Sequence, residues 1–123
     1  MLFRSDAKTG VSGAGKTPNA AFHYPARYDD MNAYRISGHQ HVYEIERELG
    51  LVAGHNVRIT FTPHVVPLCR GILTTLYAQL SEGQSIETVE AAYRSFYREE
   101  AFVRVFGPEK VQMSTYVDRK SVV

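Results

Sequence analysis

A change of hydrophobic period near the middle of the chain constrains its fold more than any other feature. Between residues 42 and 52, apolar side chains recur every three or four positions, as in a helix that buries one face, and Gly54 follows as a stop. From residue 57 to residue 62, apolar and polar side chains alternate instead, which is typical of a half-buried strand. A helix followed directly by such a strand favours an α+β fold.

Residues before and after this helix and strand add further predicted strands and a second predicted helix. Further stretches have the composition of strands: 2–7, 32–36, 72–80, 102–106 and 114–123. Ser85 is well suited to cap a second helix, because acidic residues follow it in the first turn. One face of that helix is apolar and is formed by Ile86, Val89, Tyr93 and Phe96.

The order of these elements predicts the sheet. We expect the strands at 57–62 and 72–80 to pair with each other. Residues 63–67 lie between them and carry two prolines, which would bulge or break a central ladder, so we expect an edge, a bend or a functional loop there. The predicted fold class is α+β, with a mixed, largely antiparallel sheet and helices packed on one face. Because both ends lie in strand-like sequence, the chain reads as a fragment.

Composition limits the classes of function. The chain has 123 residues, of which 44% are hydrophobic and 22% charged, as expected for one globular domain. Its formal charge of +1 predicts neither a nucleic-acid groove nor a membrane-binding patch. No signal peptide or membrane span is evident, so we expect a cytoplasmic protein. The single cysteine, Cys69, excludes an internal disulfide and, in a strand-like run, indicates a small buried side chain.

One short motif suggests nucleotide binding, but its surroundings argue against it. Residues 10–17, Gly-Val-Ser-Gly-Ala-Gly-Lys-Thr, have the spacing of a phosphate-binding loop. Pro18 follows, and residues 20–30 lack the period of the helix that would receive the phosphates. We therefore expect no nucleotide hydrolysis. The loop stays a candidate for contact with an anion or a substrate through its backbone amides and Lys16.

Residues that suit proton transfer stand at the start of the first predicted helix. His39, His41 and Glu44 can place one imidazole as a proton donor or acceptor while its neighbours fix its tautomer and charge. The same residues also fit a polar helix start that caps and solvates itself. A metal site that adds His64 or His55 is a third alternative, which we disfavour because its ligands would be scattered over loops.

Four short motifs occur in a fixed order along the chain. They are Ser-Gly-Ala-Gly-Lys at 12–16, Gly-His-Gln-His-x-x-Glu-Ile at 38–45, Phe-Thr-Pro-His-x-Val-Pro at 61–67 and Arg-Gly-Ile-Leu at 70–73. Together they resemble the N-acetyl-γ-glutamyl-phosphate reductase family, and residues 102–105 and 110–118 are similar to its closing segments. The resemblance implies an arginine-biosynthetic enzyme that reduces an acyl phosphate to an aldehyde with NADPH. It also implies a domain like the C-terminal domain of glyceraldehyde-3-phosphate dehydrogenase.

The resemblance implies catalytic roles for the histidine motif. In such enzymes a cysteine thiolate attacks the acyl phosphate and a histidine handles the protons. By its place in the motif, His41 resembles that acid/base, with His39 and Glu44 as the neighbours that orient it and tune its pKa.

The resemblance also implies substrate-binding residues. Arg70 would anchor the substrate, because a guanidinium fork suits a carboxylate or a phosphate; the alternative is an arginine merely paired at a sheet surface. Lys16 stays the candidate point charge of the loop, while Ser12 and Gly13 would shape the pocket through backbone amides and a hydroxyl. For these two residues the alternative is a tight turn that needs glycine.

The chain also departs from this family. A Gly-Cys-Tyr-Pro segment, which would carry the nucleophile upstream of residue 10, is missing, and Cys69 does not replace it. No Gly-x-Gly-x-x-Gly turn marks a dinucleotide-binding half, and residues 117–123 differ from the family's usual ending. We therefore predict a single substrate-binding and dimerisation domain over 1–123 that neither binds NADP nor turns over substrate by itself.

Two other functions stay open. The domain would serve only as a binding or dimerisation module if one sheet face formed the interface of a homo-oligomer and catalysis were absent. Alternatively, a lysine-biosynthetic relative that reduces a longer, carrier-bound acyl phosphate would share every motif named here.

Overall fold

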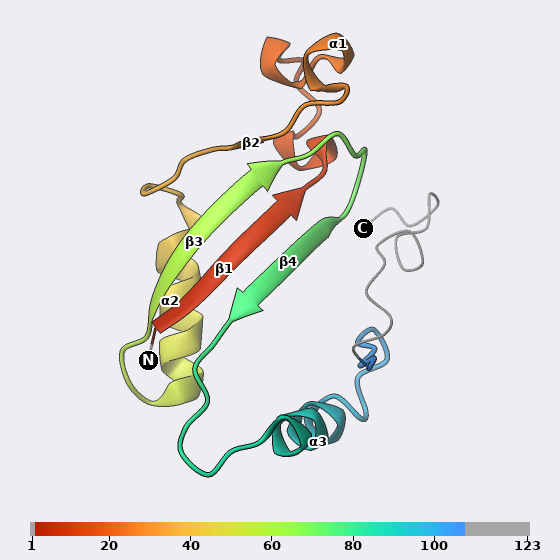
Figure 1. Ribbon diagram of the computed structural model, residues 1–123. Helices are drawn as coiled ribbons and strands as arrows, with labels where there is room; N and C mark the ends of the chain where they lie inside the picture. The colour runs from red at the N-terminus through yellow and green to blue at the C-terminus, as the bar shows by residue number, and fades with distance from the viewer. Residues whose placement is uncertain (1, 108–123) are drawn as a thin grey trace. The chain divides into compact units, whose positions relative to one another are not determined.

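The computed structural model describes residues 2–107, which form a four-stranded sheet, three α-helices and two 3-10 turns (Figure 1). The strands are β1 (Leu2–Thr9), β2 (Asn32–Ala33), β3 (Arg58–Val65) and β4 (Ile72–Tyr77). The helices are α1 (Tyr24–Arg27), α2 (His41–Ala53) and α3 (Ile86–Phe96), and the 3-10 turns are η1 (Val11–Ala14) and η2 (Ala20–Phe22). The elements fall into two compact units, the first ending at Gln79 and the second beginning at Leu80.

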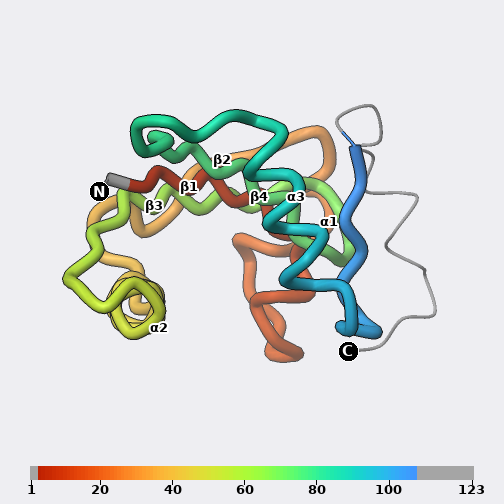
Figure 2. The backbone as a smooth tube through the Cα atoms, turned by 90° about the horizontal axis from the view of Figure 1, so that it is seen from below, coloured from red at the N-terminus to blue at the C-terminus, as the bar shows by residue number. Residues whose placement is uncertain are grey.

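The sheet of the first unit is mixed, in the order β2-β3-β1-β4. β1 pairs in parallel with β3, while the β1–β4 and β3–β2 pairs are antiparallel. The helix α2 lies on one side of this sheet (Figure 2). The predicted α+β class with a mixed, largely antiparallel sheet is therefore confirmed.

The strands β3 and β4 do not pair with each other, because β1 lies between them and pairs with both. The predicted pairing of these two strands is wrong. Alternation in the sequence indicates which face of a strand is buried, but it does not identify the neighbouring strand. The small side chains of Ser5 and Ala7, which are buried, allow β1 to occupy the centre.

β3 continues through Pro63 and ends at Val65, and the chain bends at Pro67, so the expected bend lies at the end of residues 63–67 and not at Pro63. Pro63 pairs with Ala7 of β1, and its carbonyl accepts a hydrogen bond from the Tyr34 N–H at 3.0 Å. Because the nitrogen and the carbonyl of a strand residue face the same side, the missing donor of Pro63 faces the end of β2. A proline is tolerated there because the ladder is already ending.

The helix α2 ends as its sequence predicts, and its last turns suggest a stability test. Gly54 adopts a left-handed conformation with φ of 70°, and its N–H bonds to the Gly50 carbonyl at 2.9 Å. A Cβ added at Gly50 would have the His55 carbonyl oxygen at 3.4 Å as its nearest neighbour, which is ordinary contact. We expect Gly50→Ala to stabilise the fold by about 0.5–1 kcal/mol in urea unfolding, since alanine loses less backbone entropy in a helix.

Gly54→Ala is the matched comparison for this test. A Cβ at Gly54 would meet open space, but the left-handed backbone makes alanine unfavourable by about 1 kcal/mol. A loss of stability in Gly50→Ala that equals the loss in Gly54→Ala would contradict the helical assignment of residue 50.

Glu46 joins α2 to the edge of β3. Its Oε1 accepts the Ile59 N–H at 3.1 Å, and its Oε2 lies 3.2 Å from Arg58 Nη1. The Glu46 side chain is 16% exposed, so the backbone donor it satisfies is largely shielded from water. We expect Glu46→Ala to lower the free energy of unfolding by about 1–2 kcal/mol, because that donor loses its acceptor.

Glu48→Ala is the control for Glu46→Ala. Glu48 is exposed and pairs with the neighbouring Arg47, so its removal should leave the unfolding midpoint nearly unchanged. Equal effects of the two substitutions would show that the bond to Ile59 does not hold the helix.

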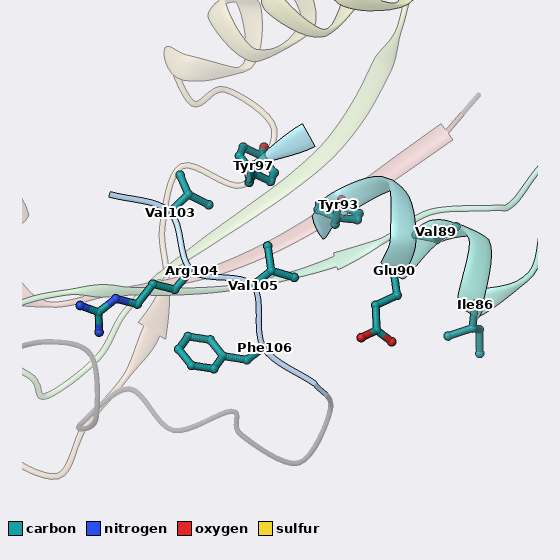
Figure 3. Close-up of a pocket in the computed structure, with 9 residues that line it drawn as sticks. All are labelled: Ile86, Val89, Glu90, Tyr93, Tyr97, Val103, Arg104, Val105 and Phe106. Carbon is teal, nitrogen blue, oxygen red and sulfur yellow. The ribbon is translucent and has the colours of Figure 1, made fainter. Parts of the chain in front are cut away.

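The second unit is built around α3. The predicted N-cap is confirmed, since the Ser85 hydroxyl accepts the Thr88 N–H and the Thr88 hydroxyl accepts the Ser85 N–H. Residues 103–106 run beside the helix and form a groove of about 600 Å³ with it, lined mainly by apolar side chains (Figure 3). The predicted strand at 102–106 is not formed; a turn bond from the Val103 N–H to the Glu100 carbonyl precedes this segment.

Two expectations fall outside the described residues: the strand at 114–123 and the closing segment at 110–118. Among residues 2–107, no helix combines the length and the apolar character that a bilayer-spanning segment needs.

Candidate functional site

A pocket of about 490 Å³ lies at the carboxyl ends of the parallel strands β1 and β3. Its wall combines these strand ends with η1 and with the turn that leads from β2 into α2. We call it the histidine pocket, after His39 and His41, which both line it. Two of the predicted catalytic residues are therefore brought together at one cavity.

His39 is the buried ring of this pocket, with 6% of its surface exposed. Its ring packs edge-on against Tyr34 and Phe61, with centroids 5.6 and 5.2 Å away. Burial lowers the pKa of His39, and the nearby charges of His41 and Arg35 lower it further. His39 Nδ1 accepts the His41 backbone N–H at 3.2 Å, which places the proton of the neutral ring on Nε2.

His41 is the exposed ring. It begins α2, its side chain is 56% exposed, and its centroid lies 4.8 Å from that of His39. Glu44 Oε2 is 3.9 Å from His41 Nε2, a contact that becomes an ion pair when the ring is protonated. Two adjacent rings, one held neutral and one open to solvent beside a carboxylate, form an arrangement that can move a proton.

The capping alternative also describes part of this geometry. The bond from the His41 N–H to His39 Nδ1 satisfies one of the free amides at the start of α2. The N-cap position itself, Gln40, provides no side-chain cap. His39 therefore has a structural role at the helix start whether or not it takes part in chemistry.

The predicted substrate-binding residues divide between two pockets. Gly13 lines the histidine pocket, whereas Ser12, Lys16 and Arg70 line a neighbouring pocket of about 480 Å³. We call the second one the basic pocket. Ala14 and Phe22 contribute to both, so the two pockets adjoin each other.

The loop at 10–17 is a tight turn held against residues 68–71. Three backbone bonds join them: Gly10 N–H to the Gly71 carbonyl, Val11 to Leu68 and Ser12 to Cys69, at 2.9, 2.9 and 3.1 Å. The Gly13 N–H bonds to the Gly10 carbonyl at 3.3 Å. In the structure the Ser12 and Gly13 amides therefore already donate to carbonyl groups, as in the alternative of a tight turn.

The helix that a phosphate-binding loop requires does not follow this turn. Lys16 and Thr17 form a bend, and the next helical turn is the short η2. The expectation against a nucleotide-hydrolysing loop agrees with this geometry.

Cys69 is exposed, so the expected burial of this side chain is wrong. The reason is that residues 66–71 form a bent connection between β3 and β4 instead of a strand. Among the described residues, no group of three or more His, Cys, Asp or Glu side chains is arranged to hold a metal ion.

The opposite face of the sheet carries a separate polar cluster. Asp6 Oδ1 lies 2.8 Å from Lys8 Nζ and 3.1 Å from His64 Nδ1. The hydrogen bond with Lys8 and the neighbouring charges lower the pKa of Asp6. These residues line neither the histidine pocket nor the basic pocket.

Several lining residues were not singled out from the sequence. Tyr34 and Arg35 enter the histidine pocket from the turn before α2, and Phe61 enters it from β3. The sequence indicates that Phe61 faces inward, since it lies on the apolar side of a predicted strand. Tyr34 and Arg35 lie in irregular sequence, where only the chain path of the fold reveals their place.

The chain is similar to known proteins over nearly its whole length. A family model described as semialdehyde dehydrogenase, dimerisation domain, matches residues 3–123. An N-acetyl-gamma-glutamyl-phosphate reductase from Syntrophobacter fumaroxidans is 44% identical over 119 residues, which are 93% of this chain and 35% of that protein. Proteins of the same name from Bacillus mycoides and Bacillus cereus are 44% and 42% identical, over 92% of this chain and 34% of each relative. The chain thus spans about a third of the length of these relatives.

Proposed function

Because this chain belongs to the semialdehyde dehydrogenase dimerisation-domain family, we propose that it forms the substrate-binding and dimerisation part of an acyl-phosphate reductase. The proposed substrate is N-acetyl-γ-glutamyl phosphate, and the product is N-acetylglutamate 5-semialdehyde, made in arginine biosynthesis. The observation that carries this proposal is the adjacency of the histidine pocket and the basic pocket, both built from the motifs that mark the reductases.

The reaction defines what the pockets have to supply. One acyl phosphate, one NADPH and one proton give the aldehyde, inorganic phosphate and NADP. NADPH supplies the hydride. The chain has no glycine pattern for a dinucleotide, so we assign the cofactor and the nucleophilic cysteine to a part of the protein outside these residues.

His41 is the proposed proton donor and acceptor. Its ring borders the pocket and remains open to solvent, so it can take a proton from water and give it to an oxygen in the pocket. His39 stays neutral beside it and fixes the start of α2, and Glu44 lies within reach of the protonated His41 ring. Glu44 and His39 are therefore proposed as positioning residues.

The basic pocket is the proposed anchor for an anionic group of the substrate. N-acetyl-γ-glutamyl phosphate carries a phosphate and a carboxylate, and Lys16 and Arg70 line this pocket together with the Ser12 side chain. Arginine provides a fixed fork of donors for such a group, while lysine adds a point charge.

Dimerisation is the second part of the proposal. β4 is an edge strand whose six residues are all exposed, including Ile72, Leu76 and Tyr77. An exposed apolar edge of this kind suits association with a second copy. A non-catalytic dimerisation module would keep this surface and lose only the chemistry, whereas a lysine-biosynthetic relative would differ in the acyl group it accepts.

The test is to produce the chain together with an N-terminal half that supplies the dinucleotide-binding domain and the cysteine. Phosphate-dependent reduction of NADP by N-acetylglutamate semialdehyde is the expected activity, and the chain alone should show none. A folded, reassembled dimer without activity would favour the non-catalytic module. Preference for a carrier-bound homologue would favour the lysine-biosynthetic reductase, and activity of the chain alone would contradict the assignment of the nucleophile to another part of the protein.

A further inference from the structure

We propose that Arg35 is an additional substrate-binding residue, whose guanidinium receives an oxyanion of the substrate in the histidine pocket. Arg35 lines this pocket together with His39 and His41. The identity of the substrate rests on the proposed function above, but the presence of an oxyanion site at Arg35 rests on the pocket itself.

The first argument is the charge balance of the pocket. Among the described residues that line it, Arg35 carries the only permanent charge, and no Asp or Glu side chain lines it. Four other arginines of the described residues pair with glutamates: Arg47 with Glu48, Arg58 with Glu46, Arg94 with Glu90 and Arg98 with Glu99. Arg35 is exposed, but it borders a cavity in which no carboxylate among the described lining residues offsets its charge, so its guanidinium is available to an anion that enters the pocket.

The second argument is that Arg35 is held in place without being neutralised. Its Nη1 donates to Gln40 Oε1, and an amide oxygen carries no charge that would compete with a ligand. Gln40 is itself a lining residue, so the bond joins two residues of the same pocket. A guanidinium fixed in this way loses less side-chain entropy when it binds an oxyanion.

The third argument is backbone strain at the same turn. Arg35 has φ of 45° and Ser37 has φ of 104°, conformations that favour glycine. The Gly38 N–H closes the turn on the Arg35 carbonyl at 3.2 Å. Strained residues persist where the surroundings require them, and they cluster at ligand-binding sites.

The location also fits a substrate with two anionic groups. Arg70 and Lys16 belong to the basic pocket, and Arg35 to the adjoining histidine pocket. A carboxylate and a phosphate at the two ends of one molecule would bind one at each. In the reverse reaction these groups arrive on separate reactants, the semialdehyde and inorganic phosphate, so each can be varied alone.

The experiment uses the full-length protein that carries this chain, with Arg35→Met, Arg35→Lys and the control Arg47→Met. Arg47 is an exposed arginine of α2 that does not line the pocket, so its loss matches the charge change. Reverse kinetics would give KM for semialdehyde and for phosphate separately. We expect Arg35→Met to raise one of these KM values by about 10- to 100-fold, the usual effect of losing a charge-assisted hydrogen bond, with little change in kcat. Arg35→Lys should lie between Arg35→Met and wild type, because lysine keeps the charge and loses the fork.

A binding measurement separates this inference from the proposed function. Calorimetric titrations with inorganic phosphate and with N-acetylglutamate, followed by NMR of the His39 ring, need no turnover. Weaker binding of either probe in Arg35→Met, with Arg47→Met unchanged, supports the site even if the protein lacks reductase activity. Equal KM values and equal binding in Arg35→Met and Arg47→Met, or a wild-type protein that binds neither probe, would overturn it. If Arg35→Met does not fold, wild-type behaviour of Arg35→Lys would overturn it as well.

Discussion

In the proposed reductase reaction, His41→Ala is expected to lower kcat of the full-length protein by about 100- to 10,000-fold while its fold persists, because proton transfer by a positioned side chain contributes that much. The His41 ring is more than half exposed, and its recorded contacts are with His39 and Glu44. Little packing is therefore lost when it is removed. Steady-state kinetics at several pH values would measure the change, and the limb of the pH–rate profile that reports the acid/base should disappear.

His55→Ala is the control for His41→Ala. His55 follows α2 and is exposed, and its ring nitrogen lies 3.1 Å from the adjacent Asn56 carbonyl oxygen, so its loss should leave kcat unchanged. The informative comparison is His39→Gln. If a folded His39→Gln protein lost activity while the His41→Ala protein kept its activity, His39 would be the acid/base and His41 the positioning residue.

Gly10→Ala is expected to destabilise the protein by about 2–4 kcal/mol, the range of a severely overpacked site. Gly10 has φ of −70°, so the requirement for glycine is one of space and not of backbone angle. An added Cβ would lie 2.8 Å from the Arg70 nitrogen and 2.9 Å from the Leu68 carbonyl oxygen. These are backbone atoms, which cannot relieve the clash by a change of rotamer as a flexible side chain could.

Relief of this clash would separate η1 from residues 68–71 and weaken the three backbone bonds between them. Because Arg70 lines the basic pocket, binding of phosphate should weaken along with stability. Urea unfolding measures the first effect, and titration with phosphate below the transition measures the second.

Gly38→Ala is the matched control for Gly10→Ala. Nothing lies within 4 Å of a Cβ added there, so the change should be within about 0.5 kcal/mol of neutral or slightly stabilising. Similar unfolding midpoints for Gly10→Ala and Gly38→Ala would mean that η1 and the 68–71 connection are not packed as the structure shows.

The local elements could be predicted from the sequence because each has its own signal. The period of α2, its stop at Gly54 and the cap at Ser85 all depend on nearest neighbours along the chain. The pairing partner of a strand, by contrast, does not depend on its nearest neighbours along the chain. β3 and β4 both alternate, and only the insertion of β1, far earlier in the sequence, decides that they lie on opposite sides of it.

The candidate site could be predicted in part for the same reason. His39, His41 and Glu44 share one short motif, so a correct helix start brings them together. The division of Gly13 and Arg70 between two pockets could not be predicted, because it depends on how η1 docks against residues 68–71. Arg35 was missed because an irregular turn gives no period that points its side chain toward a cavity.

The parallel pairing of β1 with β3 has a consequence for how the protein forms. Leu2 pairs with Arg58, and all the turn residues that bring Arg35, His39 and His41 to the pocket lie inside the loop that this pairing closes. Closing so long a loop costs entropy before any contact repays it, and sheets built from such distant partners fold slowly. During synthesis β1 emerges long before both of its partners, so one of its edges stays unpaired until residue 65 has left the ribosome and the other until residue 77 has left it. The histidine pocket is thus a late product of folding, and a nascent chain interrupted before β3 would expose the unpaired edges of β1 and would lack this pocket.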